Sequence, residues 1–191
     1  MKQLLRIIFL IFIIASCSPK KYEHPRILIT TQYGEIEAEL YPDKAPKSVA
    51  AFISYIDSGY YKNTTFYRVL KDDELPNDNN TGLIQGGLWP AKKNLPGIPH
   101  ESTKQTGLTH ENGTLSLARL GAGSASTEFF ICIGEKQQLD AGGSGTADSL
   151  GYAAFGKVIK GMKIVRKIQN QNSTGDHFDK PVTISNIELE E

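Results

Sequence analysis

The sequence predicts a mainly β protein whose strands close into an antiparallel barrel accompanied by two helices. Three observations lead to this prediction. Short segments rich in β-branched and aromatic residues outnumber helical ones, they do not alternate one to one with helices, and 18 Gly and 9 Pro supply many turns. One-to-one alternation is typical of a doubly wound parallel sheet, so that class is disfavoured. Closure into a barrel buries many short strands without leaving free edges.

The predicted strands begin with a hairpin and continue after the first helix. Residues 26–31 and the strictly alternating segment 36–40 predict the hairpin, with its turn at 32–35. Later segments that predict strands are 66–70, 83–87, 114–118, 129–133, 153–159 and 181–189. Stretches that are polar or rich in Gly and Pro are typical of loops, and they lie at 72–82, 89–113 and 141–151.

Two segments have a helical pattern. The first begins near Pro46, which suits the first helical position, and ends at Gly59. Its apolar residues are spaced i, i+3, i+4, i+7 and comprise Val49, Phe52, Ile53 and Ile56. The second helix is predicted over residues 161–170. Each helix therefore has one apolar face that can pack against the sheet.

Length, charge and motifs narrow the classes of function. A chain of 191 residues suits one globular domain. Lys+Arg and Asp+Glu both number 21, so the chain lacks the positive excess that holds a phosphate backbone, and we expect no nucleic-acid partner. The patterns G-x-S-x-G, H-E-x-x-H and C-x-x-C do not occur, and no two histidines have a close zinc-ligand spacing. We therefore expect no metal site.

Residues 1–16 have the pattern of a secretory signal peptide. Lys2 and Arg6 are followed by an uncharged apolar run that is far shorter than the roughly 20 residues needed to cross a bilayer. The segment that ends this run, Ile14-Ala15-Ser16-Cys17, resembles a bacterial lipobox. The resemblance implies cleavage before Cys17 and acylation of that residue. The alternative is an ordinary signal peptide, or an uncleaved anchor, with a chance cysteine.

The lipobox resemblance also predicts the domain limits and the location. Residues 17–25 would form a lipidated tether, and residues 26–191 the folded domain. Several acyl chains give stable anchoring, so we expect the domain in the cell envelope, at the periplasmic face of the outer membrane rather than at the inner membrane. Cys132 has no partner once Cys17 is lipidated, and its apolar neighbours predict a buried free thiol.

One predicted strand places a charge in apolar surroundings. Arg68 lies within Phe66-Tyr67-Arg68-Val69, and a buried arginine without a partner is costly. Gln85 lies on the next predicted strand, within Ile84-Gln85-Gly86-Gly87. Either the two polar side chains belong to a site, or Arg68 simply points outward from a barrel strand.

Several segments, in the same order along the chain, are similar to the signature of the cyclophilins. Thr65-Phe66-Tyr67-Arg68-Val69 followed by Ile84-Gln85-Gly86-Gly87 resembles the family's F-H-R-V and Q-G-G. The other similar segments are residues 43–49, 113–119 (Gly-Thr-Leu-Ser-Leu-Ala-Arg), 128–131 (Glu-Phe-Phe-Ile), 139–140, 155–158 and 161–162. The resemblance extends from about residue 27 to residue 189. It implies a closed eight-stranded antiparallel barrel capped by two helices, and peptidyl-prolyl cis–trans isomerase activity without a cofactor.

The resemblance also implies roles for individual residues. Rotation about an X–Pro amide crosses a barrier of about 18–20 kcal/mol, and an enzyme must stabilise the twisted state. The family pattern implies that Arg68 donates to the prolyl nitrogen, that Gln85 binds the carbonyl and holds the arginine, and that Phe130 is the main wall of the proline pocket. The further substrate-binding residues that it implies are Phe66, Leu83, Ala118, Arg119, Glu128, Leu139 and Tyr152.

The sequence departs from the family pattern around these residues. The segment between Arg68 and Gln85 is longer than usual, and Gly82 stands where an aromatic residue is usual, which would leave one pocket wall open. Glu128 replaces a glutamine, and its charge could pair with Arg68 or Arg119 or favour basic peptides. The other replacements are Tyr67 and Tyr152 for histidines and Gln138 for a tryptophan. Loss of the tryptophan predicts weak cyclosporin binding, because its indole N–H is a donor to that ligand.

Two functions remain open on the sequence alone. The leading one is an isomerase that acts on proline-containing segments of unfolded proteins and assists the folding of cell-envelope proteins. The alternative is a proline-peptide-binding or chaperone module with the same fold and little turnover. In either case we expect a monomer that reaches the membrane through the lipid on Cys17.

Overall fold

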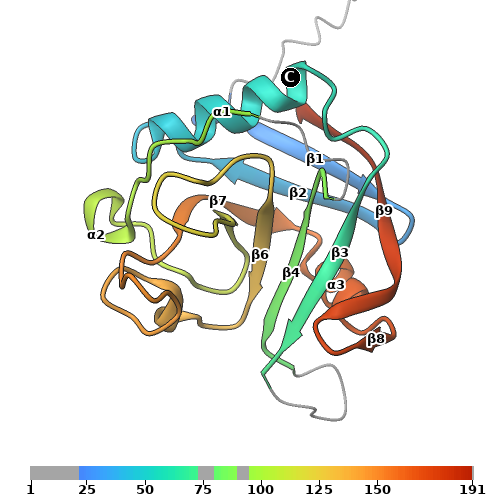
Figure 1. The fold of residues 1–191 in the computed structure, drawn as a ribbon. Coiled ribbons are helices and arrows are strands. Elements are labelled where there is room, and N and C mark those ends of the chain that lie inside the picture. The colour runs from blue at the N-terminus through green and yellow to red at the C-terminus, as the bar shows by residue number, and fades with distance from the viewer. Residues whose placement is uncertain (1–21, 73–79, 90–94, 191) are drawn as a thin grey trace, which may run out of the picture.

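The computed structural model describes residues 22–72, 80–89 and 95–190. The predicted signal peptide, Cys17 and most of the predicted tether lie outside the described residues. Nine strands form one antiparallel sheet in the order β1-β2-β7-β5-β6-β4-β3-β9-β8, and pairing of β1 with β9 closes eight of them into a barrel (Figure 1). The short strand β8 extends this ring beyond β9. The closed eight-stranded barrel predicted from the sequence is confirmed.

The strand and helix bounds agree closely with the sequence pattern. The strands are β1 Arg26–Thr31, β2 Gly34–Leu40, β3 Thr64–Lys71, β4 Gly82–Gly87, β5 Thr114–Leu117, β6 Phe129–Ile133, β7 Ala153–Lys160, β8 Ser173–Thr174 and β9 His177–Glu190. The two predicted helices are α1 Pro46–Asp57 and α3 Met162–Gln169. The sequence did not predict the single turns α2 Thr103–Thr106 and Gln137–Leu139, because one turn is too short to show a periodic pattern.

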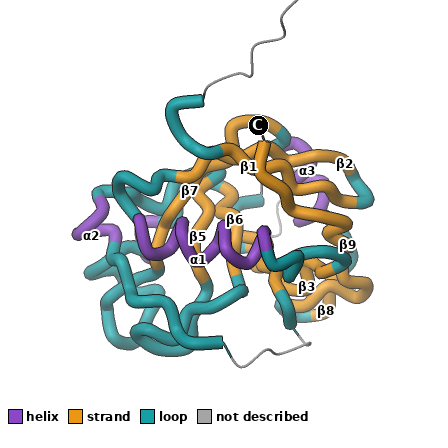
Figure 2. Tube along the Cα trace, turned by 90° about the horizontal axis from the view of Figure 1, so that it is seen from above, coloured by secondary structure: helices purple, strands orange, loops and turns teal. Residues whose placement is uncertain are grey.

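The two longer helices lie on different parts of the barrel (Figures 1 and 2). Helix α1 packs against β7 and β9, whereas α3 packs against β2, β3, β4 and β6. Phe52 of α1 lies in the barrel core, with its ring centroid 5.4 Å from that of Phe129 and 4.9 Å from that of Phe155. The apolar stripe predicted for the first helix therefore covers the core, as expected. Among the described residues, none of the helices has the length and apolar character needed to cross a membrane.

Strand β6 is apolar on both of its faces, and this positions the site. Phe129, Ile131 and Ile133 point into the barrel core. Phe130 and Cys132 instead join Leu83 in a second apolar cluster on the outside of the barrel. Burial raises the pKa of the Cys132 thiol, and the thiol is free, as the sequence predicted. The outer face of β4 and β6 is thus an apolar floor rather than a solvated surface.

Candidate active site

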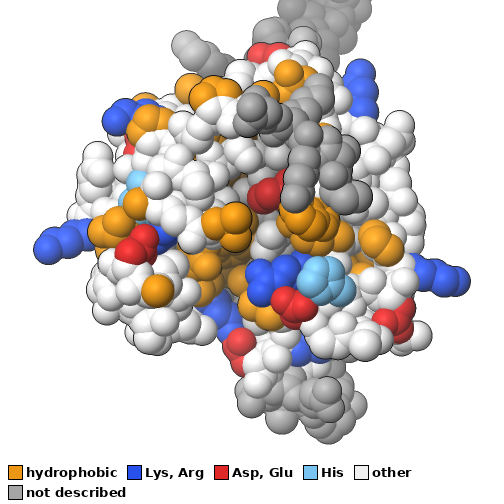
Figure 3. All heavy atoms as spheres, viewed as in Figure 1, with side chains coloured by type: hydrophobic (Ala, Val, Ile, Leu, Met, Phe, Trp, Pro, Cys, Tyr) orange, Lys and Arg blue, Asp and Glu red, His pale blue; other side chains and the backbone are white. Residues whose placement is uncertain are grey.

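A groove with a volume of about 840 Å³ lies over this outer floor. Side chains from β3, β4 and β6 line its centre, and residues 118–128 and the segment around Tyr152 line its edges. Figure 3 shows this face, where apolar, basic and acidic side chains meet. The groove combines an apolar bottom with a few polar groups, as small-ligand and peptide sites commonly do.

The strand register brings the predicted polar and apolar residues side by side. Arg68 of β3 pairs with Gln85 of β4, and Gln85 pairs with Phe130 of β6. On its other side Arg68 pairs with His177 of β9. The register shifts between Phe66 and Arg68, where a β-bulge changes the face of the sheet to which the following side chains point. One guanidinium, one amide and one aromatic ring thus stand in a row across neighbouring strands.

Two acceptors fix the guanidinium of Arg68. Its Nη1 donates to Oε1 of Gln85 at 3.1 Å, and its Nε donates to Oδ2 of Asp176 at 2.7 Å. The hydrogen bond from Arg68 lowers the pKa of the Asp176 carboxyl below its ordinary value. The remaining nitrogen, Nη2, donates to no described residue. Arg68 thus points outward from the barrel, and the outer face at this point is the groove.

Tyr67 and Glu128 form a second pair beside this row. The Tyr67 hydroxyl donates to Oε2 of Glu128 at 2.6 Å and accepts from Nε2 of Gln85 at 2.7 Å. Burial raises the pKa of Glu128, although hydrogen bonds from Tyr67, Thr127 and backbone N–H groups oppose the shift. Burial, and then the hydrogen bond to Glu128, raise the pKa of Tyr67. Glu128 therefore faces Tyr67, and no ion pair joins it to Arg68 or Arg119, both of which are described.

An apolar pocket adjoins the guanidinium. Phe130 is nearly buried, and its ring lies edge-on to that of Tyr152 with centroids 5.3 Å apart. Leu83 belongs to the same cluster, and Leu139 packs against it. Such a pocket can hold a proline ring, while the guanidinium and amide beside it can bind the polar groups of the peptide bond. Within the described residues, no group of three or more His, Cys, Asp and Glu side chains could hold a metal ion.

Comparison with known proteins agrees with this geometry. Residues 26–189 match the family model described as cyclophilin type peptidyl-prolyl cis-trans isomerase/CLD. The chain belongs to this family. A peptidyl-prolyl cis-trans isomerase of Acinetobacter baylyi is 36% identical over 167 residues, which cover 83% of this chain and 82% of the relative. Peptidyl-prolyl cis-trans isomerase B of Escherichia coli is 34% identical over 161 residues, covering 79% and 89%.

Solved structures agree as well. A cyclophilin-type isomerase of Cryptosporidium parvum aligns with a TM-score of 0.71 and 25% identity, covering 88% of this chain and 98% of its own. A second structure from that organism, determined in the presence of the dipeptide Ala-Pro, aligns with a TM-score of 0.70. The chain is therefore a cyclophilin-type isomerase in fold and in activity, as its sequence motifs implied.

The structure brings together all but one of the residues that the motifs singled out. Those lining the groove are Arg68, Leu83, Gln85, Ala118, Arg119, Glu128, Phe130, Leu139 and Tyr152. Phe66 is the exception, and its assignment to substrate binding is wrong. Its side chain is fully buried in the barrel core, with its ring centroid 5.8 Å from that of Phe129. Phe66 is two residues before Arg68, and the bulge between them separates the two faces that they occupy.

Arg119 lines the groove, but its side chain is engaged elsewhere. Its Nη1 and Nη2 each donate to Asp148 at 2.7 Å, and its Nε donates to the carbonyl of Gly151 at 2.9 Å. These bonds raise the pKa of Arg119 and lower that of Asp148. Arg119 therefore fastens the loop at 141–151 to the groove edge, so only its backbone is left to meet a peptide.

Several groove residues were not predicted from the sequence. They are Leu70, Leu88, Trp89, Leu120, Ser124, Ser126, Thr127, Gly145 and His177, and Asp176 acts on the groove through Arg68. Asp176 and His177 lie more than a hundred positions after Arg68, and no local motif connects them. Leu120, which is fully exposed, and Trp89, which is 46% exposed, could have been suspected only from their exposure in the fold.

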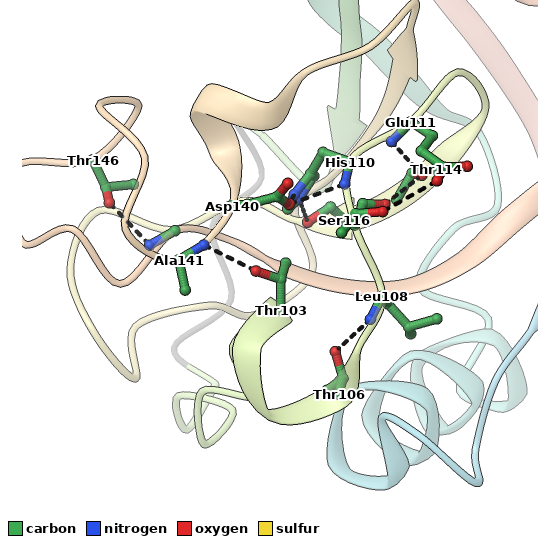
Figure 4. A network of polar contacts seen from close by, with 12 residues as sticks. Thr103, Thr106, Leu108, His110, Glu111, Thr114, Ser116, Asp140, Ala141 and Thr146 are labelled. Carbon is green, nitrogen blue, oxygen red and sulfur yellow. Dashed lines mark hydrogen bonds and ion pairs between the residues drawn. The ribbon is translucent and has the colours of Figure 1, made fainter.

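A second polar network lies behind the pocket wall (Figure 4). The His110 ring contacts Asp140 through Nδ1 at 2.6 Å and Ser116 through Nε2 at 2.9 Å. The residue types and order of contacts are those of a serine hydrolase triad, yet His110 and Ser116 are both fully buried. Burial lowers the pKa of His110 despite the opposing effect of Asp140. The His110 ring stacks on Phe130 with centroids 5.9 Å apart, so this network supports the wall of the pocket.

Gly82 has a structural reason to lack a side chain. Its φ of 145° is unfavourable for other residues, and a Cβ would overlap the carbonyl oxygen of Leu70. An aromatic ring therefore cannot occupy this position. Leu70 and His177 are among the residues that line the groove.

Proposed function

We propose that this isomerase acts on proline-containing segments of unfolded proteins in the cell envelope, while a lipid on Cys17 holds it to the membrane. The observation that supports the catalytic part is the row of Arg68, Gln85 and Phe130 across three paired strands. A rigid barrel holds these side chains in place before the substrate arrives, and preorganised donors are the most effective kind.

Each residue of the row has a distinct role in this proposal. When the X–Pro amide twists, resonance is lost and the prolyl nitrogen gains a localised lone pair. Arg68 donates a hydrogen bond to that lone pair and stays charged at any working pH. Gln85 holds the guanidinium and binds the carbonyl of the substrate. Phe130, Leu83 and Leu139 enclose the proline ring, and the backbone at Ala118 binds the extended peptide.

A protease-coupled assay on a proline tetrapeptide tests the catalytic proposal. We expect catalytic amounts of the chain to speed isomerisation well above the uncatalysed rate, and Phe130→Ala to raise KM because the proline pocket loses its wall. Leu189→Ala is the control, since it shortens a partly exposed apolar side chain that does not line the groove. Rates that do not exceed the uncatalysed one would refute the proposal.

One observation favours a second candidate function, a module that binds proline segments with little turnover. Gly82 stands where the family pattern has an aromatic residue, and its φ of 145° and the nearby carbonyl oxygen of Leu70 leave no room for a side chain there. If this candidate is right, a proline peptide binds in the groove but its cis–trans isomerisation is not accelerated. A proline peptide that binds the wild type, measured by calorimetry, but isomerises no faster in its presence would establish it.

The membrane location rests on the lipobox-like segment that ends at Cys17. The first strand begins at Arg26, so a short tether would keep the domain near the bilayer, and we favour the periplasmic face of the outer membrane. Cys17→Ser should release the protein from the membrane fraction, because it removes the acylated sulfur. A variant that stays wholly with membranes would mean that residues 4–15 persist as an anchor.

A further inference from the structure

A one-way series of hydrogen bonds leads from Arg68 to Glu128. Nη1 of Arg68 donates to Gln85, Nε2 of Gln85 donates to Tyr67, and the Tyr67 hydroxyl donates to Glu128, at 3.1, 2.7 and 2.6 Å. All four residues line the groove. Tyr67 and Glu128 are separate departures from the family pattern in the sequence, and the structure joins them as one pair.

The chemistry of the groups fixes the direction of this series. An ionised carboxylate only accepts, so Tyr67 must give its single hydroxyl proton to Glu128. The tyrosine then offers Gln85 only a lone pair, which the amide NH₂ group of Gln85 must occupy. The carbonyl oxygen of Gln85 is thereby turned toward Arg68, as the 3.1 Å contact requires. A neutral amide at position 128 could donate as well as accept and would not impose this direction.

Glu128 is itself held firmly in the groove wall. Its Oε1 accepts from the backbone N–H of Trp89 and from the Thr127 hydroxyl, both at 3.2 Å. Gly87 makes room for it: the φ at this glycine is 149°, and a Cβ there would lie 2.5 Å from Oε1. Backbone and neighbouring side chains thus fix the carboxylate at the far end of the series. This use of its charge leaves little for a basic residue of the substrate.

We propose that Tyr67 and Glu128 are positioning residues for isomerisation, which orient Arg68 through Gln85. The inference rests on the proposed role of Arg68 as the donor to the prolyl nitrogen. Tyr67 and Glu128 do not touch the reacting atoms in this account. They set which end of the Gln85 amide meets the guanidinium and so hold the guanidinium toward the groove.

The test compares Tyr67→Phe, Glu128→Gln and the double variant on basic, neutral and acidic proline peptides. Tyr67→Phe removes both bonds of the hydroxyl, and Glu128→Gln removes the fixed direction of the series, so kcat should fall by about three- to tenfold on every peptide while KM stays within about a factor of two. The double variant should be no slower than the slower single one, because a series is broken only once. Tyr33→Phe and Glu111→Gln are matched controls that lose bonds to Gln171 and Lys157 outside the groove, and they should keep the wild-type rate.

Unfolding midpoints and an Arg68→Ala arm complete the design. Midpoints close to the wild type will show that any loss of rate is not a loss of fold. A loss confined to peptides with Lys or Arg beside proline would overturn the proposal and assign Glu128 to substrate charge. Multiplying effects in the double variant, or an unchanged kcat in both single variants, would also overturn it. If Arg68→Ala isomerises the peptides as fast as the wild type, the proposed role of Arg68 itself is wrong. If Arg68→Ala is slow but Tyr67→Phe and Glu128→Gln keep the wild-type kcat, only the proposed role of Tyr67 and Glu128 is wrong.

Discussion

Two polar networks lie on either side of Phe130, and they differ in how far they are open to solvent. The row from Arg68 to Glu128 lines the groove, and the Arg68 side chain is 34% exposed. The network of His110, Asp140 and Ser116 lies behind the same ring, where His110 and Ser116 are fully buried. The buried network has the residue types of a nucleophilic site, whereas the exposed row has no nucleophile. Access to a peptide, rather than residue type, distinguishes the network that we propose for catalysis from the buried one.

The two networks should therefore fail in different ways. Loss of a groove side chain removes an interaction with the substrate and leaves packing nearly intact. Loss of a buried side chain leaves polar partners without hydrogen bonds, which costs folding free energy. Each of the following changes tests this separation between rate and stability.

The largest effect is expected from Arg68→Ala. Removal of one preorganised donor at a developing charge costs about 3–4 kcal/mol, so kcat/KM should fall by about two to three orders of magnitude. The urea midpoint should barely move, since the side chain is partly exposed and lies outside the core. Protease-coupled rates and urea titrations measure both quantities. A folded variant that keeps more than about half of the wild-type rate would contradict the role given to the arginine.

His110→Ala should instead destabilise the fold. The buried Ser116 and the partly exposed Asp140 would each lose a hydrogen bond, and the vacated ring would leave a cavity behind Phe130, so we expect a loss of about 2–4 kcal/mol. His100→Ala is the matched control, because that ring is less buried than His110 and its polar contact is with the backbone carbonyl of Leu150. Urea unfolding at pH 7.5 compares the two. Equal midpoints would mean that the buried network does not stabilise the protein.

The buried histidine also predicts a pH dependence of stability. Burial lowers the pKa of His110 from its ordinary 6.5, so below that pH the unfolded chain binds a proton that the native protein excludes. Stability should therefore fall as the pH decreases from 7.5 to 5.5, by at most about 1.4 kcal/mol per pH unit from this one group. The slope should be smaller in His110→Gln, whose amide does not titrate. Identical slopes in the two proteins would rule out this linkage.

The smallest effect is expected from Asp176→Asn. The carboxylate orients Arg68 through Nε, but its side chain is 42% exposed, and solvent and salt weaken such a pair. We expect kcat to fall by about two- to fivefold, and the difference from the wild type to shrink in high salt. Asp179→Asn is the control, since Asp179 accepts from Thr174 and lies off the groove. A rate equal to that of the control would show that Gln85 alone positions the guanidinium.

Local pattern predicted most of the fold. Runs of β-branched and aromatic residues predicted the strands, alternation supported the hairpin, and an i, i+3, i+4, i+7 stripe predicted α1, because these signals reside in a few neighbouring residues. The motifs around Arg68, Gln85 and Phe130 predicted residues that the structure brings together in one groove. The wrong assignment of Phe66 has a physical cause, since a bulge between Phe66 and Arg68 changes which side chains face the groove, and a bulge has no clear sequence signal.

The polar contacts of the site could not be predicted in the same way. Asp176 meets Arg68 across a separation of 108 residues, and Asp140 meets His110 across 30. Such pairs depend on strand register and on loop paths that only the closed barrel defines. Glu128 illustrates the same limit: its charge drew attention in the sequence, but its partner is Tyr67 rather than an arginine.

The separation of the two networks is tested most directly by exchange NMR on a proline peptide with catalytic amounts of wild type, Arg68→Ala or His110→Ala. The measurement follows cis–trans exchange itself, without a coupling protease, at a temperature where all three proteins are folded. We predict that exchange with Arg68→Ala falls nearly to the uncatalysed rate, while His110→Ala stays within about tenfold of wild type. Equal losses in the two variants, or rapid exchange with Arg68→Ala, would contradict the account.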